Sequence, residues 1–272
     1  MEMVLGLIGP QMDVMYVFLN NVGMELYFIS ALLGVIGLVI GSFVSVVTYR
    51  IPRNLGFVKG RSFCDNCKKD LNWYDNMPIL SFFFYRGKSK CCKEKISPRY
   101  PLIEIASASG AYFLFFNFSN FFSNYNTMQW HALILFYMLY IVSLAIVVID
   151  IEHQIIPDEM IWILLLLGLL LNHGSLITAF FSSFLFSLLL LFLYLVTLGR
   201  GMGLGDVKLA IPLGFMLGIE KGFYWIISSF ILGGITATIL LILKRANLKT
   251  KIAFGPFLII GFWLVIFTNR LF

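Results

Sequence analysis

Charge is scarce in this chain. Only 12% of its 272 residues are Asp, Glu, Lys or Arg, whereas 60% are hydrophobic, and the mean hydropathy is +0.90. A soluble domain needs a charged surface, so this composition excludes the one or two soluble domains that the length alone would allow. The sequence therefore predicts a polytopic membrane protein whose helices face lipid as well as one another.

Basic residues are absent from the N-terminal part of the chain, where the first Lys or Arg is Arg50. A secretory signal peptide begins with a basic region, so we expect no signal peptide here. Residues 1–23 are expected to form either a short interfacial segment or an exported tail.

The basic residues that do occur are concentrated in one segment. Twelve of the twenty Lys and Arg residues lie between Arg50 and Arg99. The formal net charge of +6 could by itself suggest a nucleic-acid partner. In a membrane protein, however, such a cluster is typical of a cytoplasmic loop, because basic residues stay on the cytoplasmic side. We therefore expect a cytoplasmic insert at residues 50–99 and no nucleic-acid partner.

Apolar runs of membrane-crossing length predict an all-α polytopic membrane protein with about eight transmembrane helices and one cytoplasmic, cysteine-containing insert. With the insert inside, eighteen of the twenty basic residues lie in inside loops, and the outside turns keep only Lys221 and Arg270. This split agrees with the positive-inside rule. The expected spans are residues 25–48, 101–118, 130–149, 157–172, 175–198, 206–219, 222–243 and 251–269.

These runs divide the chain into three predicted parts. Residues 1–49 hold the N-terminal segment and the first transmembrane helix. Residues 50–100 form a basic loop domain that contains all four cysteines. Residues 101–272 form a membrane core of seven helices.

Two aspartates fall at the same depth in this topology. Asp150 ends an apolar run, and Asp206 follows the glycine-rich stretch 201–205. An ionisable residue at the end of a membrane helix is costly and indicates function. Asp158, by contrast, is explained by a helix start after Pro157. Two neighbouring carboxylates can share a proton, as in an aspartic protease, so we predict Asp150 and Asp206 to be catalytic.

Several short motifs occur in a fixed order along the chain. They are Gly41-Ser42-Phe43, Tyr49-Arg50-Ile51-Pro52, Asn76-Met77-Pro78-Ile79-Leu80-Ser81, Ile96-Ser97-Pro98-Arg99-Tyr100-Pro101-Leu102-Ile103-Glu104, Asp150 with Ile156-Pro157-Asp158, Gly203-Leu204-Gly205-Asp206 and Phe254-Gly255-Pro256-Phe257. Together they resemble the bacterial type IV prepilin peptidase (leader peptidase/N-methyltransferase) family of GxGD-type intramembrane aspartyl proteases. The resemblance covers most of residues 34–258 and implies that Asp150 and Asp206 are the catalytic pair.

The resemblance implies an integral-membrane aspartyl endopeptidase of the bacterial cytoplasmic (inner) membrane. Such an enzyme cleaves the leader of type IV prepilins or pseudopilins after a Gly at the cytoplasmic membrane face. It also N-methylates the new N-terminus with S-adenosylmethionine. No binding motif for S-adenosylmethionine is visible in the sequence, so this cofactor rests on the resemblance alone.

Other functions fit parts of the pattern. A cation- or proton-coupled membrane transporter would also use two intramembrane aspartates, and inverted repeats would favour it. A membrane scaffold with a zinc-held loop would make both aspartates dispensable. A phosphate-binding loop is excluded at the glycine stretch, because Lys208 is followed by Leu209 and the glycine spacing differs.

The four cysteines are Cys64 and Cys67, in a C-x-x-C pair, and the adjacent Cys91 and Cys92. Four thiolates in a small polar insert suggest a structural zinc site, which would stabilise a segment too short for its own core. The resembling family has a second C-x-x-C, which would fall on positions 89 and 92, but position 89 is Ser. Cys91 is the candidate replacement ligand, although adjacent cysteines chelate one ion awkwardly. Free thiols are the alternative, and a disulfide is disfavoured in a reducing compartment.

Overall fold

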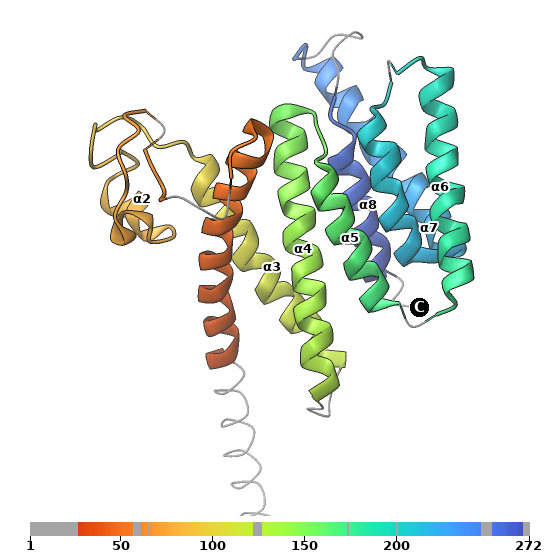
Figure 1. The fold of residues 1–272 in the computed structure, drawn as a ribbon, viewed down its shortest axis with the longest axis horizontal. Coiled ribbons are helices and arrows are strands. Elements are labelled where there is room, and N and C mark those ends of the chain that lie inside the picture. The colour runs from red at the N-terminus through yellow and green to blue at the C-terminus, as the bar shows by residue number, and fades with distance from the viewer. Residues whose placement is uncertain are drawn as a thin grey trace, which may run out of the picture. The chain divides into compact units, whose positions relative to one another are not determined.

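The computed structural model describes residues 27–56, 61–64, 66–121, 127–172, 174–199, 201–245 and 252–268. Within these ranges the protein is helical, with two isolated β-bridges and no strand (Figure 1). This confirms the predicted all-α class. The expectation for residues 1–23 lies outside the described part of the chain.

Every predicted span overlaps a helix or one leg of a helix. The first helix is Tyr27–Arg53, and the described part of the insert contains only short helices. Among the described residues, four helices are long and apolar enough to cross a membrane, namely Tyr27–Arg53, Trp130–His153, Leu176–Val196 and Leu204–Ile242. The labelled helices are η1 (Ile51–Arg53), η2 (Trp73–Asn76), α2 (Leu80–Phe84), α3 (Arg99–Phe121), α4 (Thr127–His153), α5 (Asp158–Leu171), α6 (Leu176–Val196), α7 (Leu204–Ile242) and α8 (Gly255–Thr268).

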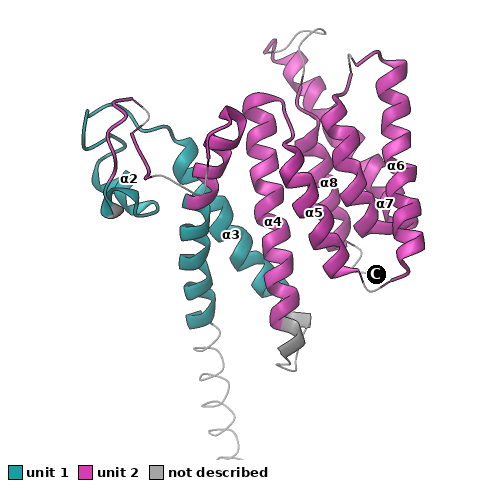
Figure 2. Ribbon diagram, in the orientation of Figure 1, with its two compact units in different colours: residues 1–42, 72–124 teal, residues 43–71, 125–272 magenta. Residues whose placement is uncertain are grey.

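The chain forms two compact units (Figure 2), one of Met1–Ser42 with Asn72–Asn124 and one of Phe43–Leu71 with Tyr125–Phe272. In the first unit the first helix packs closely on α3. A Cβ atom added to Gly37 would lie 2.7 Å from the Cα atom of Ala108, so this contact requires a glycine. Ser107 Oγ donates a hydrogen bond to the Gly37 carbonyl at 2.7 Å. Small residues thus let two membrane helices approach backbone to backbone.

In the second unit α7 is broken at Gly218, whose φ of 72° and ψ of −174° are not helical. The sequence predicts two spans here, residues 206–219 and 222–243. The break falls at Gly218, two residues before the predicted gap at residues 220–221. The ring of Phe186 on α6 lies against both Gly214 and Gly222, which flank the break. The two legs of α7 therefore fold back at Gly218 rather than continuing as one straight helix.

The second leg of α7 packs along α8 in the opposite direction. Trp225 Nε1 donates to the Leu258 carbonyl at 2.8 Å, and the rings of Phe230 and Phe254 lie 5.0 Å apart. Residue numbers thus rise along one helix as they fall along the other. This pairing places Gly255, the first residue of α8, at the same end of the unit as the start of α7.

Three serine side chains fasten the first leg of α7 to α6. Ser182, Ser183 and Ser187 donate hydrogen bonds at 2.9, 3.0 and 3.1 Å to the carbonyls of Gly214, Ile211 and Val207. Hydroxyl groups that bond across helices contribute to association where water is absent. This ladder fixes the rotation and height of the leg that begins with Asp206.

Replacing Ser182 with alanine is expected to remove one rung of this ladder. Ser182 is fully buried, so the Gly214 carbonyl would lose its interhelical partner, at a cost of about 1 kcal/mol. Thermal denaturation in detergent should show a Tm lower by a few degrees. The control is Thr178→Ala on the same helix, where the exposed hydroxyl bonds only to the Ser175 carbonyl. Equal Tm values for the two variants would contradict the ladder's role.

Candidate active site and metal site

Asp150 lies in the last turn of α4 and is only 5% exposed. The backbone N–H of Gly255, at the start of α8, donates to Asp150 Oδ2 at 3.0 Å. A Cβ atom on Gly255 would lie 2.6 Å from that same oxygen. A side chain at position 255 would therefore displace the carboxylate, which explains on physical grounds why glycine stands in the Phe254-Gly255-Pro256 motif.

Asp206 lies in the first turn of α7 and is 6% exposed. The N–H of Gly203 donates to Asp206 Oδ2 at 3.0 Å, and the N–H of Asp206 donates back to the Gly203 carbonyl at 3.2 Å. Acids in a first turn are also favoured by the helix dipole. The glycine stretch thus positions this carboxylate through its own backbone.

Ile156, in the connection between α4 and α5, lies close to a glycine neighbour of each aspartate. A Cβ atom on Gly205 would lie 3.2 Å from Ile156 Cβ, and one on Gly255 would lie 3.2 Å from Ile156 Cδ1. The isoleucine side chain therefore lies between the residue before Asp206 and the residue that binds Asp150. Ile156 is therefore a shared neighbour of the two glycines that flank the aspartates.

An ion pair beside this site was missed by the sequence reasoning. Lys208 Nζ lies 2.8 and 3.0 Å from the two carboxylate oxygens of Asp158. Asp158 is in the first turn of α5, where the sequence places it, and its side chain is 61% exposed. The pair connects the start of α5 to the start of α7. In the sequence, the only sign of this ion pair was that Lys208 and Asp158 carry opposite charges and lie at the same predicted depth in the membrane.

Glu104 is a second residue whose role the sequence did not show. It is 7% exposed in α3 and accepts a hydrogen bond at 2.8 Å from the N–H of Ile79. Ile79 has a φ of 59°, which a β-branched residue rarely adopts, and it is the N-cap residue immediately before α2. The carboxylate of Glu104 therefore holds the strained start of a helix in the insert.

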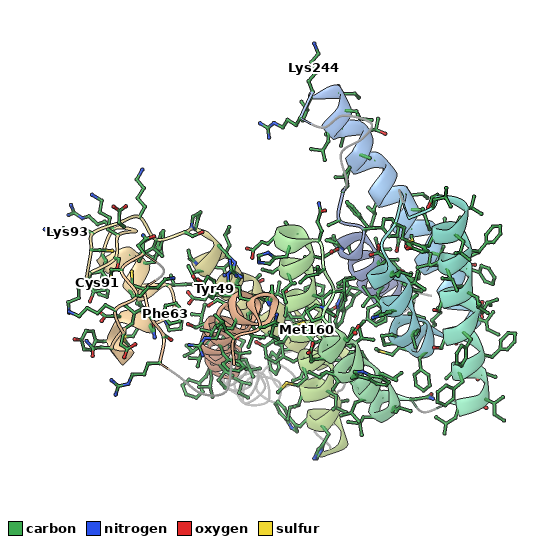
Figure 3. The ribbon with its side chains drawn as sticks, turned by 45° about the horizontal axis from the view of Figure 1, so that its top comes forward. Tyr49, Phe63, Cys91, Lys93, Met160 and Lys244 are labelled. Atoms are coloured by element: carbon green, nitrogen blue, oxygen red, sulfur yellow. The ribbon has the colours of Figure 1, made fainter. Side chains whose placement is uncertain are left out.

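The end of the first helix fastens the start of the insert. Arg50 is 6% exposed, and its guanidinium donates to the carbonyls of Gly56 and Arg61 at 3.1 and 2.9 Å. The rings of Tyr49 and Phe63 meet edge to face with centroids 6.2 Å apart (Figure 3). Arg50 thus has a structural role at the start of the insert.

The two cysteine-bearing turns of the insert have the same backbone pattern. In the first, Lys68 N donates to the Cys64 carbonyl and Cys64 N donates to the Lys69 carbonyl, both at 2.9 Å. In the second, Lys93 N donates to the Ser89 carbonyl at 2.8 Å, and Ser89 N donates to the Glu94 carbonyl at 2.7 Å. Lys68 and Lys93 both have positive φ, of 57° and 60°.

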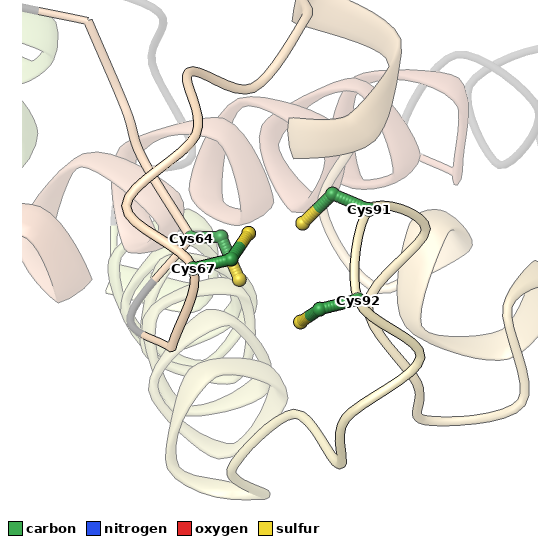
Figure 4. A group of neighbouring side chains, drawn as sticks. All are labelled: Cys64, Cys67, Cys91 and Cys92. Carbon is green, nitrogen blue, oxygen red and sulfur yellow. The ribbon is translucent and has the colours of Figure 1, made fainter.

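When the two turns are aligned by these hydrogen bonds, Ser89 corresponds to Cys64 and Cys92 corresponds to Cys67. The serine therefore occupies the place of a ligand, as the motif spacing indicates. Ser89 Oγ lies 3.0 Å from Cys91 Sγ. The sulfur atoms of Cys64, Cys67, Cys91 and Cys92 all lie within 4.8 Å of one another (Figure 4).

This group of thiols has the chemistry and spacing of a zinc site. Four sulfurs at about 2.3 Å from one tetrahedral zinc ion would lie about 3.8 Å apart, which is compatible with the observed group. Cys64 is buried and Cys92 is half-buried, so the ion would be partly shielded from solvent. Although Cys91 and Cys92 are adjacent in the sequence, the sulfur atoms of both belong to the group.

Two family profiles match this chain. The profile of the bacterial peptidase A24 N-terminal domain matches residues 35–118, and that of the type IV leader peptidase family matches residues 137–238. A prepilin leader peptidase/N-methyltransferase of Stutzerimonas stutzeri is 33% identical over 268 residues, which cover 85% of this chain and 88% of the relative. The chain belongs to the type IV leader peptidase family.

Other relatives agree with this assignment. Proteins with the same name from Pseudomonas aeruginosa and Vibrio cholerae are 32% and 29% identical. The aligned regions cover 85% and 88% of this chain, and 87% and 97% of the respective relatives. No solved structure matches the chain.

Family membership confirms the enzyme class predicted from the motifs and sets aside the transporter. The chain is a membrane peptidase of the type IV leader peptidase family, and the relatives' names add an N-methyltransferase. The match at residues 137–238 includes both Asp150 and Asp206, and the match at residues 35–118 includes all four cysteines.

Proposed function

We propose that this peptidase removes the leader of type IV prepilins or pseudopilins, with Asp150 and Asp206 as its catalytic pair. The observation that carries the proposal is the pair of buried aspartates, each held by a glycine N–H, with Ile156 beside both Gly205 and Gly255. The cut follows a Gly at the cytoplasmic membrane face, and the new N-terminus is then methylated with S-adenosylmethionine.

The arrangement supports the chemistry of an aspartic protease. One ionised carboxylate takes a proton from water as the water oxygen bonds to the scissile carbonyl carbon, while the other carboxyl group, protonated, donates to the carbonyl oxygen. The C–N bond then breaks, and a proton passes to the leaving amine. The glycine hydrogen bonds use Oδ2 of each aspartate, so we assign Oδ1 to proton transfer.

The charge distribution supports the proposed side of the membrane. With the basic insert in the cytoplasm, the ends of α4 and α7 that carry the aspartates face the cytoplasm too. A prepilin with a basic leader and an apolar helix would present the bond between them at this level. The enzyme therefore belongs in the bacterial cytoplasmic membrane in this proposal.

The proposal is tested by incubating the purified protein with a prepilin and measuring product masses. We expect one leader peptide ending in Gly, and a mature product that is one methyl group heavier when S-adenosylmethionine is present. A prepilin in which that Gly is replaced by Val is the control and should remain uncut. Uncut wild-type prepilin in the presence of folded enzyme would contradict the proposed substrate.

We also propose that Cys64, Cys67, Cys91 and Cys92 bind one structural zinc ion. The donor set and the spacing of the sulfurs support it. Zinc would supply the folding energy that the small insert lacks, because ligation of a structural ion is coupled to folding. In this arrangement Cys91 takes over the role that the Ser89 position would have had.

The purified protein should contain about one equivalent of zinc, which Cys91→Ser should lose. The double variant Ser89→Cys with Cys91→Ser restores a second C-x-x-C and should regain the metal. Metal content and the protease resistance of the insert are measured together. Leader cleavage should persist without zinc, since the aspartates lie on other elements, whereas methylation should fail. Full zinc content in the Cys91→Ser single variant would refute the ligand assignment.

A further inference from the structure

A cavity in the membrane core has no role in the proposed peptidase. It is partly open and has a volume of about 350 Å³ between residues of α4, α5, α7 and α8. Its deepest walls are the buried side chains of Leu139, Leu217 and Phe262. Two polar residues, Asn172 and Lys221, also line it. The volume falls within the range of roughly 300–1,000 Å³ that is typical of small-molecule sites.

The cavity lies at the end of the helices opposite to the aspartates. Asn172 follows the last residue of α5, and Asp158, which pairs with Lys208 beside Asp206, is the first residue of that helix. A helix of 14 residues is about 20 Å long, so the two sites are separated by most of a bilayer core. The break at Gly218 places Leu217 and Lys221 on either side of the fold in α7.

The polar groups of the cavity are hydrogen-bond donors. Asn172 Oδ1 accepts from the N–H of Gly174 at 2.8 Å, so Nδ2 is the donor end of the amide that this bond does not use. That nitrogen is buried and has no hydrogen-bond partner among the described residues, a costly state that calls for an acceptor. Lys221 adds an exposed ammonium group at the same cavity.

Charge complementarity identifies the ligand class. Among the described residues that line the cavity none is acidic, and the neighbouring Glu220 is not part of the lining. An amide donor and an ammonium group match an anionic head with several acceptor oxygens. The apolar walls match a hydrocarbon chain. Free phosphate would interact with the amide and ammonium donors but would leave the apolar walls without a partner.

We propose that this cavity binds an anionic phospholipid of the bilayer. The phosphate diester lies at Lys221 and Asn172 Nδ2, and an acyl chain lies along Leu139, Leu217 and Phe262. The lipid then fills the space that the fold in α7 opens and stabilises the pairing of its two legs with α5 and α8. This inference does not depend on the identity of the peptidase substrate.

The test uses the purified full-length protein, titrated with phosphatidylglycerol or with phosphatidylcholine of the same acyl chains, and inorganic phosphate alone. Native mass spectrometry gives the bound fraction, and thermal denaturation gives the Tm. Phosphatidylglycerol should remain bound and raise the Tm more than the other two. Lys221→Gln should weaken its binding about tenfold, or about 1.4 kcal/mol, because the variant lacks the charged partner of the phosphate.

The matched control is Lys244→Gln, which removes the same charge at the far end of α7 (Figure 3) and outside the cavity. It should bind phosphatidylglycerol as the wild type does. Asn172→Asp provides a second variant, which should repel the anionic head while keeping the side-chain shape. Equal binding of the two lipids, equal loss in both lysine variants, or full stabilisation by inorganic phosphate would each overturn the proposal.

Discussion

Replacing Gly255 with alanine is expected to lower prepilin cleavage about a hundredfold, because a displacement of about 1 Å at a catalytic group costs that much. The new Cβ atom would lie 2.6 Å from Asp150 Oδ2, well inside van der Waals contact. The carboxylate would have to move away, and its hydrogen bond from the Gly255 N–H would lengthen or break. A single methyl group would thereby displace a proposed catalytic oxygen without changing any charge.

The control for this variant is Gly234→Ala in the second leg of α7. A Cβ atom there meets nothing within 4 Å, and alanine favours a helix over glycine by about 1 kcal/mol. Gly234→Ala should therefore cleave prepilin at the wild-type rate and keep or raise the Tm. Steady-state cleavage rates and Tm values of both variants check the prediction. Normal cleavage by Gly255→Ala would contradict the proposed positioning of Asp150.

The importance of Gly255 could not be derived from the sequence. It lies 105 residues after Asp150, and only the fold brings its N–H to that carboxylate. The two glycines of the Gly203-Leu204-Gly205-Asp206 motif differ in how closely they are packed. The structure gives Gly205 a tight contact with Ile156, whereas a Cβ atom on Gly203 would have an ordinary contact with Asp206 Oδ2 at 3.6 Å.

Hydropathy was sufficient to predict the helices, because each membrane span must satisfy its own backbone hydrogen bonds. It also predicted that the run would divide, because Glu220 and Lys221 interrupt it, but the observed break lies at Gly218, two residues earlier. The orientation in the membrane and the three-part domain division stay predictions. The serine ladder of α6 and the cavity depend on which faces of the helices meet. Hydropathy carries no information on those faces in helices that are apolar all round.

The aspartates were predicted from their depth and from the motifs around them, and their catalytic role stays a prediction. Asp150→Asn and Asp206→Asn are each expected to lower cleavage by at least about a thousandfold. An asparagine keeps the shape of the side chain and can still accept the glycine N–H through its carbonyl oxygen. It cannot accept the proton from water, and it cannot serve as the protonated carboxyl group that donates to the carbonyl oxygen. The variants should therefore fold but lose turnover.

Asp158→Asn is the matched control for these two substitutions. It makes the same change in a residue that lies beside the site and pairs with Lys208. Both partners are more than half exposed, so the ion pair contributes less than about 1 kcal/mol to stability. This variant should cleave within a few-fold of the wild type.

The central claim is that Asp150 and Asp206 together perform the cleavage. It is tested most directly by the single-turnover rate of prepilin cleavage, measured for the wild type and the three Asp→Asn variants after their Tm values are shown to be equal. We predict that the variants at positions 150 and 206 produce no leader peptide above the enzyme-free control, while the variant at position 158 remains active. A rate within about tenfold of the wild type for either Asp150→Asn or Asp206→Asn would contradict the two-carboxylate mechanism.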